Sequence, residues 1–179
     1  MRTLFVAAIA LTLTGPALAQ SVTERAANTL GMTPSTESFI KTVAVSDMFE
    51  IESSKLAQEK ADAQSKAFAG KMIKDHTGTS AELKAIAAKA KIEVPTALDS
   101  SHQSKLDKLK SLNGADFDKQ YDADQLAVHK DAVSLFERYA KGGDNKQLKA
   151  FAAKHLPHLK AHQRMAEGLQ KQTSGEKSR

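Results

Sequence analysis

The sequence contains no cysteine and no tryptophan. Without cysteine the chain has no disulfide bond, no thiolate metal ligand and no thiol nucleophile, so packing has to stabilise the fold. Without tryptophan or any cluster of aromatic and basic residues, it lacks the stacking surface typical of proteins that bind nucleic acid. A Gly-rich phosphate-binding loop is also missing. These absences disfavour thiol enzymes, enzymes built on a phosphate-binding loop, and nucleic acid as a partner.

Long apolar runs are almost absent, and the one that occurs, over residues 4–13, is too short to span a bilayer. It follows the basic Arg2 and precedes Ala-Leu-Ala at residues 17–19, a small-x-small cleavage signal. This pattern predicts a signal peptide over residues 1–19, cleaved after Ala19, and a periplasmic protein without a transmembrane segment after processing. The alternative is an uncleaved N-terminal anchor.

Charge of neither sign is concentrated in one part of the chain. Of 26 basic and 21 acidic residues, removal of the signal peptide takes away Arg2 and leaves 25 against 21, a net charge of about +4. Lysine alternates with glutamate and aspartate, and only the tail GEKSR is mildly basic. This distribution is typical of solvated helix surfaces.

Apolar residues recur at intervals of three and four along most of the mature chain, which is the spacing of one face of an α-helix. Residues 20–34 lack this pattern and are predicted as a flexible lead-in, and residues 173–179 as a disordered tail. The predicted domain covers residues 35–172. Its long helices are predicted over residues 36–62, 65–91, 115–141 and 145–171, with a short helix over residues 101–112 in the connector between the second and the third.

No segment shows the alternating pattern of a strand, so the predicted fold class is all-α. The connector is long enough to cross from one end of a helical bundle to the other, as the single crossover of ferritin-like folds does. Together these features predict a ferritin-like four-helix bundle, in which the first two long helices form one hairpin and the last two form another.

The stretch KHLPHLKAH, over residues 154–162, carries three of the 6 histidines of the chain. Their spacing places them on the apolar stripe of the last helix, so we expect them to face the core. Pro157 lies between them and removes one backbone hydrogen bond, at about 3 kcal/mol, which predicts a kink. Two interpretations of the kink are open: it bends the helix around the core, or it changes the direction in which the histidine side chains point. The predicted stripe consists of Leu148, Phe151, His155, His158, His162, Met165 and Leu169.

Each long helix also carries a polar residue near its midpoint, on or beside its apolar stripe. If the four helices are aligned end to end, one carboxylate and three imidazoles converge at mid-depth. The residues nearest the midpoints are Glu50, His76, His129 and His158, with His155 and His162 one turn to either side of the last.

Such a convergence predicts one of two arrangements. Because a buried glutamate without a partner is costly and neutral imidazole is the commonest metal ligand, these residues could bind zinc or copper. The alternative is a hydrogen-bonded Glu–His network in the core, without metal. A di-iron carboxylate site is disfavoured, because Ile73 and Leu126 stand where its Glu-x-x-His pairs would need glutamate.

Two methionines lie close to these histidines in the sequence. Met72 stands four residues before His76, and Met165 stands three residues after His162. Their thioethers could bind copper, although methionine at helical spacing is more often part of the core. Met72 is therefore a candidate for supporting the ligands.

Four pieces of the chain resemble a known family: FIKTVAVSDMFEIESSKLA, KAFAGKMIKDH, LNGADFDKQYDADQLAVHKDAVSLF and FAAKHLPHLKAHQRMA. In combination they make the chain similar to domain-of-unknown-function family 4142 over nearly all of residues 35–169. Its members are mostly exported bacterial proteins, often labelled outer-membrane proteins and grouped with ferritin-like folds. The resemblance implies export and a ferritin-like fold, and it implies no reaction, because the function of the family is unknown.

The resemblance also implies site residues. The positions that match the family pattern are Glu50, Asp75, His76, His129 and His162. His162 stands five residues after the proline of the Leu-Pro pair, whereas His155 and His158 are not part of the pattern. The resemblance thus favours His162 over His158 as the fourth metal ligand, and it places Asp75 beside the ligands as a supporting residue.

The sequence predicts an exported helical bundle that binds a divalent metal and has a role in metal handling or envelope stress. The alternative is a non-enzymatic structural or interaction module of the cell envelope, with a polar Glu–His core, no metal, and an envelope protein or a second copy of the chain as partner. An enzyme is disfavoured, because no acid–base pair and no substrate pocket can be recognised in the sequence.

Overall fold

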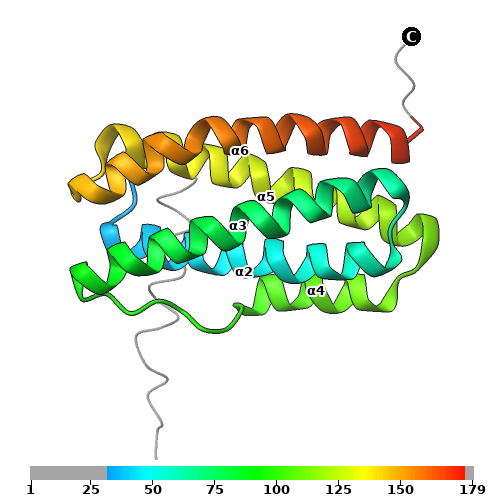
Figure 1. The fold of residues 1–179 in the computed structure, drawn as a ribbon, viewed down its shortest axis with the longest axis horizontal. Helices are drawn as coiled ribbons and strands as arrows, with labels where there is room; N and C mark the ends of the chain where they lie inside the picture. The colour runs from blue at the N-terminus through cyan, green and yellow to red at the C-terminus, as the bar shows by residue number, and fades with distance from the viewer. Residues whose placement is uncertain (1–31, 176–179) are drawn as a thin grey trace, which may run out of the picture.

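The computed structural model describes residues 32–175, and within that range every regular element is a helix (Figure 1). The all-α prediction is therefore confirmed, and each helix begins and ends within two residues of its predicted bounds. The predicted signal peptide and most of the lead-in lie outside the described residues. The helices are α2 (Thr36–Lys60), α3 (Ala63–Ala90), α4 (Ser100–Ser111), α5 (Gly114–Gly142) and α6 (Lys146–Thr173).

Polar side chains cap α2, α3, α4 and α6 at their N-termini. The Ser35 side chain accepts a hydrogen bond from the Ser38 backbone N–H at the start of α2, and the Asn145 side chain caps α6 in the same way. At the turn between α2 and α3, where neither glycine nor proline interrupts the chain, the Asp62 carboxylate accepts hydrogen bonds from two backbone N–H groups. The Asp62 cap therefore marks the start of α3, at a position where the sequence has no helix-breaking residue.

The long helices lie side by side as two antiparallel hairpins, one formed by α2 and α3 and the other by α5 and α6 (Figure 1). The hairpins meet where α2 contacts α5 and where α3 contacts α6. The segment 91–113, which includes α4, runs back along the molecule beside α2, so that α5 starts at the opposite end from the end of α3 (Figure 1). Segment 91–113 thus connects opposite ends of the molecule.

The hydrophobic core is divided into two clusters along the helices. One cluster contains Phe39 and Leu83 and is centred on the start of α2 and the end of α3. The other contains Phe68 and Phe117 and is centred on the opposite end. On each of α3, α5 and α6 a buried histidine falls between the segments that belong to the two clusters. The apolar packing therefore encloses a polar layer near the middle of the molecule.

Helix α6 continues through Pro157, which is exposed. The predicted apolar stripe of this helix is right at His162 and wrong at His158 and Met165, because the buried residues beyond His155 are Leu159, His162 and Ala166. His158 is exposed instead. The buried residue that follows His155 is Leu159, four positions later, whereas the prediction chose His158, three positions later. Because a helical turn contains 3.6 residues, spacings of three and four alternate along a buried face.

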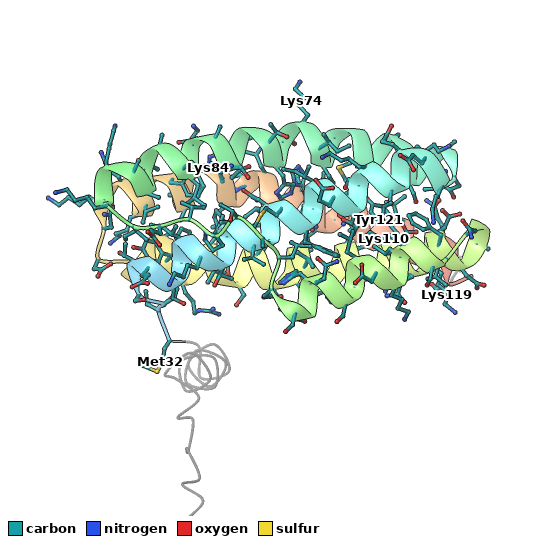
Figure 2. All side chains as sticks on the ribbon, turned by 90° about the horizontal axis from the view of Figure 1, so that it is seen from below. Met32, Lys74, Lys84, Lys110, Lys119 and Tyr121 are labelled. Atoms are coloured by element: carbon teal, nitrogen blue, oxygen red, sulfur yellow. The ribbon has the colours of Figure 1, made fainter. Side chains whose placement is uncertain are left out.

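Charged side chains cover the outside of the helices. Figure 2 shows Lys74 and Lys119 projecting away from the helices that carry them, and both are exposed. This agrees with the prediction of solvated helix surfaces. Among the described residues, no helix combines the length and the apolar character needed to cross a membrane.

Candidate metal centre

Three histidines from three helices meet in the polar layer. His76 lies on α3, His129 on α5 and His162 on α6, and their exposed fractions are 3%, 1% and 2%. The ring centroids lie 5.4 to 5.6 Å apart in all three pairs. One hairpin thus supplies one imidazole and the other hairpin supplies two.

Each of the three rings is held by a hydrogen bond at one nitrogen. His76 Nδ1 lies 2.7 Å from Asp47 Oδ1, and His162 Nε2 lies 2.9 Å from Asp75 Oδ2. His129 Nδ1 donates to the backbone carbonyl of Gln125 at 2.8 Å. Carboxylates and carbonyls accept hydrogen bonds, so these contacts place the proton on the held nitrogen and leave the other nitrogen as a lone-pair donor.

The second nitrogen of each ring has no hydrogen-bond partner among the described residues. These atoms are His76 Nε2, His129 Nε2 and His162 Nδ1, and all three are buried. One ligand atom from each histidine lies within 4.8 Å of those from the other two. Four ligands around a tetrahedral ion lie about 3.3 Å from one another, so a closure of on the order of 1 Å brings the rings to coordination distance.

The electrostatics keep two of the rings neutral. Burial, together with the positive charge of His76, lowers the pKa of His129 to about 3 and the pKa of His162 to about 4. At His76 burial also lowers the pKa, but the hydrogen bond and the charge of Asp47 outweigh it, so the pKa is raised. A metal ligand must be the neutral imidazole, which His129 and His162 supply at neutral pH.

Asp47 is the functional residue that sequence reasoning missed. Its carboxylate is buried, holds His76 through one oxygen, and accepts a hydrogen bond from Ser80 Oγ at 3.1 Å through the other. The one available signal is its position three residues before Glu50, which places both carboxylates on the same face of α2. Only the alignment of α2 against α3 shows which histidine it orients.

The family resemblance placed Asp75, the neighbour of His76 in the sequence, beside the ligands as a supporting residue. In the structure it instead contacts His162 on another helix. Its Oδ2 atom also accepts a hydrogen bond from Lys71 Nζ at 2.6 Å. Burial alone would raise the pKa of Asp75, but the contacts with Lys71 and His162 outweigh it and lower the pKa. The carboxylate is therefore ionised and fixes the orientation of His162.

Glu50 lies next to the three histidines. It does not belong to the group whose ligand atoms lie within 4.8 Å of one another, which consists of His76, His129 and His162 alone. It has no exposed surface, and neither carboxylate oxygen has a hydrogen-bond partner among the described residues. Its Oε1 atom lies 3.8 Å from His129 Nδ1, the nitrogen bonded to the Gln125 carbonyl. Burial raises the pKa of Glu50 to about 7, although the nearby His76 lowers it in part.

The remaining candidates lie away from this cluster or have no contact with it. His158 is exposed on α6, and the Nε2 atom of His155 is bonded to Glu82 at 2.9 Å. Met72 is fully buried in one of the two hydrophobic clusters, and Met165 is 39% exposed. The structure thus brings together His76, His129 and His162, with Asp47, Asp75 and Glu50 around them.

Residues 21–169 match the family described as "Domain of unknown function (DUF4142)". No curated protein and no solved structure matches the chain. The match covers all of the residues that form the three-histidine cluster and the carboxylates around it.

Proposed function

Because the chain belongs to the DUF4142 family, whose description assigns no activity, we propose a function from the geometry: the protein binds a divalent cation through His76, His129 and His162. The observation that carries the proposal is a set of three buried imidazoles, each with one nitrogen that has no hydrogen-bond partner among the described residues, and with ligand atoms that lie within 4.8 Å of one another. Each ring is also fixed at its other nitrogen by an oxygen acceptor. Metal-binding histidines are typically oriented in this way.

The alternative is a hydrogen-bonded core network without metal, and the hydrogen bonds favour it less. Buried polar atoms in proteins nearly always have partners, and each one left without a partner costs about 1–3 kcal/mol. While all three rings are neutral, the three free nitrogens are acceptors, so they cannot satisfy one another. A bound cation accepts a lone pair from all three at once.

The ligand set favours zinc or copper. Three imidazoles suit these ions, whereas magnesium and calcium prefer oxygen ligands. Thiolates are not available, because the chain has no cysteine. The buried carboxylate of Glu50 adds negative charge beside the cluster when it is ionised, which further favours a cation.

One observation favours the structural alternative. The pair of His76 and Asp47, at 2.7 Å, is a complete internal ion pair when the ring is protonated. A protein that used this pair only to hold α2 against α3 would need no metal. We retain this as the second candidate: an interaction module of the cell envelope.

The proposed setting of the metal site is a ferritin-like four-helix bundle that is exported to the periplasm after cleavage behind Ala19. The hairpin pairing and the crossover of segment 91–113 support the bundle. The apolar run after Arg2 supports export. In that compartment the site would serve metal handling or the response to envelope stress.

Thermal unfolding with and without metal tests the proposal. A ligand that binds only the folded state stabilises it by about 2.7 kcal/mol at one hundred times its Kd, so zinc or copper should raise the melting temperature of the wild type. His129→Ala should abolish the metal-dependent rise, whatever its effect on the melting temperature without metal. His102→Ala, in the short helix α4, should leave the rise intact. An equal rise in the His129→Ala and wild-type proteins would reject the site.

A further inference from the structure

The metal site proposed above leaves one coordination position open, and the inference that follows rests on that site. Zinc in proteins is usually tetrahedral, and sites that keep three protein ligands take water or an exogenous ligand in the fourth position. Glu50 does not belong to the set of mutually close ligand atoms. The fourth ligand therefore has to be Glu50 after a movement, or a molecule from outside.

A cleft lies beside the cluster, on the side of α2, α4 and α5, and ends at His76. Its cavity volume is about 370 Å³, and His76 and Asp47 form part of its wall. His129 and His162 do not line it. Hydroxyl groups make up much of the remaining polar wall, from Thr42, Ser46, Thr79, Ser101 and Ser134. A cavity of this size is in the range that small molecules occupy.

Lys105 gives the cleft a positive charge near the site. Its side chain is only partly exposed, and its Nζ atom lies 3.7 Å from Asp124 Oδ1 and 5.9 Å from the centre of the Phe49 ring. Its charge also lowers the pKa of the buried Glu50, so the ammonium acts on groups beside the histidines. Arg138 lines the same cleft and adds a second cationic group.

Two acidic residues, Asp47 and Asp131, line the cleft and could repel an anion, but each does so only weakly. Both oxygens of Asp47 already accept hydrogen bonds, one from His76 and one from Ser80. Asp131 is exposed, so water screens its charge. The cation bound by the three histidines would add two positive charges at the inner end of the cleft.

We propose that a small anion, of the size of azide or a short carboxylate, enters through this cleft and binds the metal in the fourth position, with Lys105 attracting it. Hydroxyl side chains along the wall provide hydrogen-bond donors for its remaining oxygen or nitrogen atoms. The site therefore receives a ligand from solution and is not closed by protein groups on all sides.

Cobalt(II) loaded into the purified mature protein provides the measurement, because the visible absorption of the ion responds to a change of ligand. Azide and acetate are titrated into the loaded wild type, and each should give a saturable spectral change. Lys105→Met keeps much of the side-chain volume and removes the charge, and it should weaken azide binding about tenfold, or about 1.4 kcal/mol. Lys108→Met, on the same helix and outside the cleft, is the matched control.

A further variant tests the route. Ser46→Phe places a ring in the cleft and should suppress the response to azide while cobalt remains bound. If cobalt binds and neither anion changes the spectrum, the fourth position is closed and this inference fails while the metal site stands. If cobalt does not bind, both fail. Equal azide affinity in Lys105→Met, Ser46→Phe and the wild type would overturn the cleft as the entry route.

Discussion

Each imidazole of the cluster has two separate tasks, one at each nitrogen. The held nitrogen of His76 contacts Asp47, that of His129 contacts a backbone carbonyl, and that of His162 contacts Asp75. These contacts fix the orientation of the ring and raise its basicity toward a metal. A ring cannot turn without losing a buried hydrogen bond, so the nitrogen without a partner stays inside the cluster.

The pH dependence of metal affinity should follow His76. The pKa of His129 is lowered to about 3 and that of His162 to about 4, so neither ring binds a proton near neutral pH. Asp47 raises the pKa of His76 above its usual 6.5. Since a proton on His76 excludes the metal, affinity should be full above the pKa of His76 and fall as pH decreases through it.

Asp47→Asn removes the charge that holds this proton. The pH at which metal affinity falls should therefore move to a lower value, and affinity at high pH should drop about 10–100-fold because the ring is less well oriented. Competition with a chromophoric chelator between pH 5 and 8 measures both effects. Glu52→Gln, an exposed substitution on the same helix, is the control, and identical pH profiles for the two variants would contradict the role given to Asp47.

At the scale of the helices, local signals in the sequence predicted most of the structure. Apolar spacing located the five helices of the described residues, and capping residues helped to place the starts of α2 and α6, because both signals act within a few residues of chain. The histidine on α6 was harder to predict from spacing, since midpoint alignment pointed to His158 and the structure buries His162. A helix turns by 3.6 residues, so a small error in the phase of the stripe exposes one histidine and buries another.

The turn between α2 and α3 depends on one side chain. Asp62 accepts hydrogen bonds from the backbone N–H groups of Gln64 and Ser65, at 3.0 and 2.8 Å. Asp62→Ala should lower the free energy of unfolding by about 1 kcal/mol, the usual loss for an N-cap. Urea denaturation measures the change. Asp107→Ala, which removes an exposed ion pair with Lys110, should cost less than about 0.5 kcal/mol, and equal losses would argue against the cap.

At the scale of the whole molecule, the cluster joins the two hairpins. His76 belongs to the hairpin of α2 and α3, and His129 and His162 belong to the hairpin of α5 and α6. An ion bound by all three connects the hairpins between the two hydrophobic clusters. Contacts of this kind, including those of Asp47 and Asp75, depend on how helices far apart in the sequence are aligned. No local pattern predicts that alignment to within one turn.

Metal content tests the central claim most directly. The mature protein, purified without a histidine tag and dialysed after exposure to zinc or copper, is analysed for bound metal together with two variants of α6. His162→Ala removes a buried ring of the cluster, and His158→Ala removes an exposed ring one turn away. We expect about one ion per chain in the wild type and in His158→Ala, and almost none in His162→Ala. Equal metal content in the two variants, or none in the wild type, would contradict the three-histidine site.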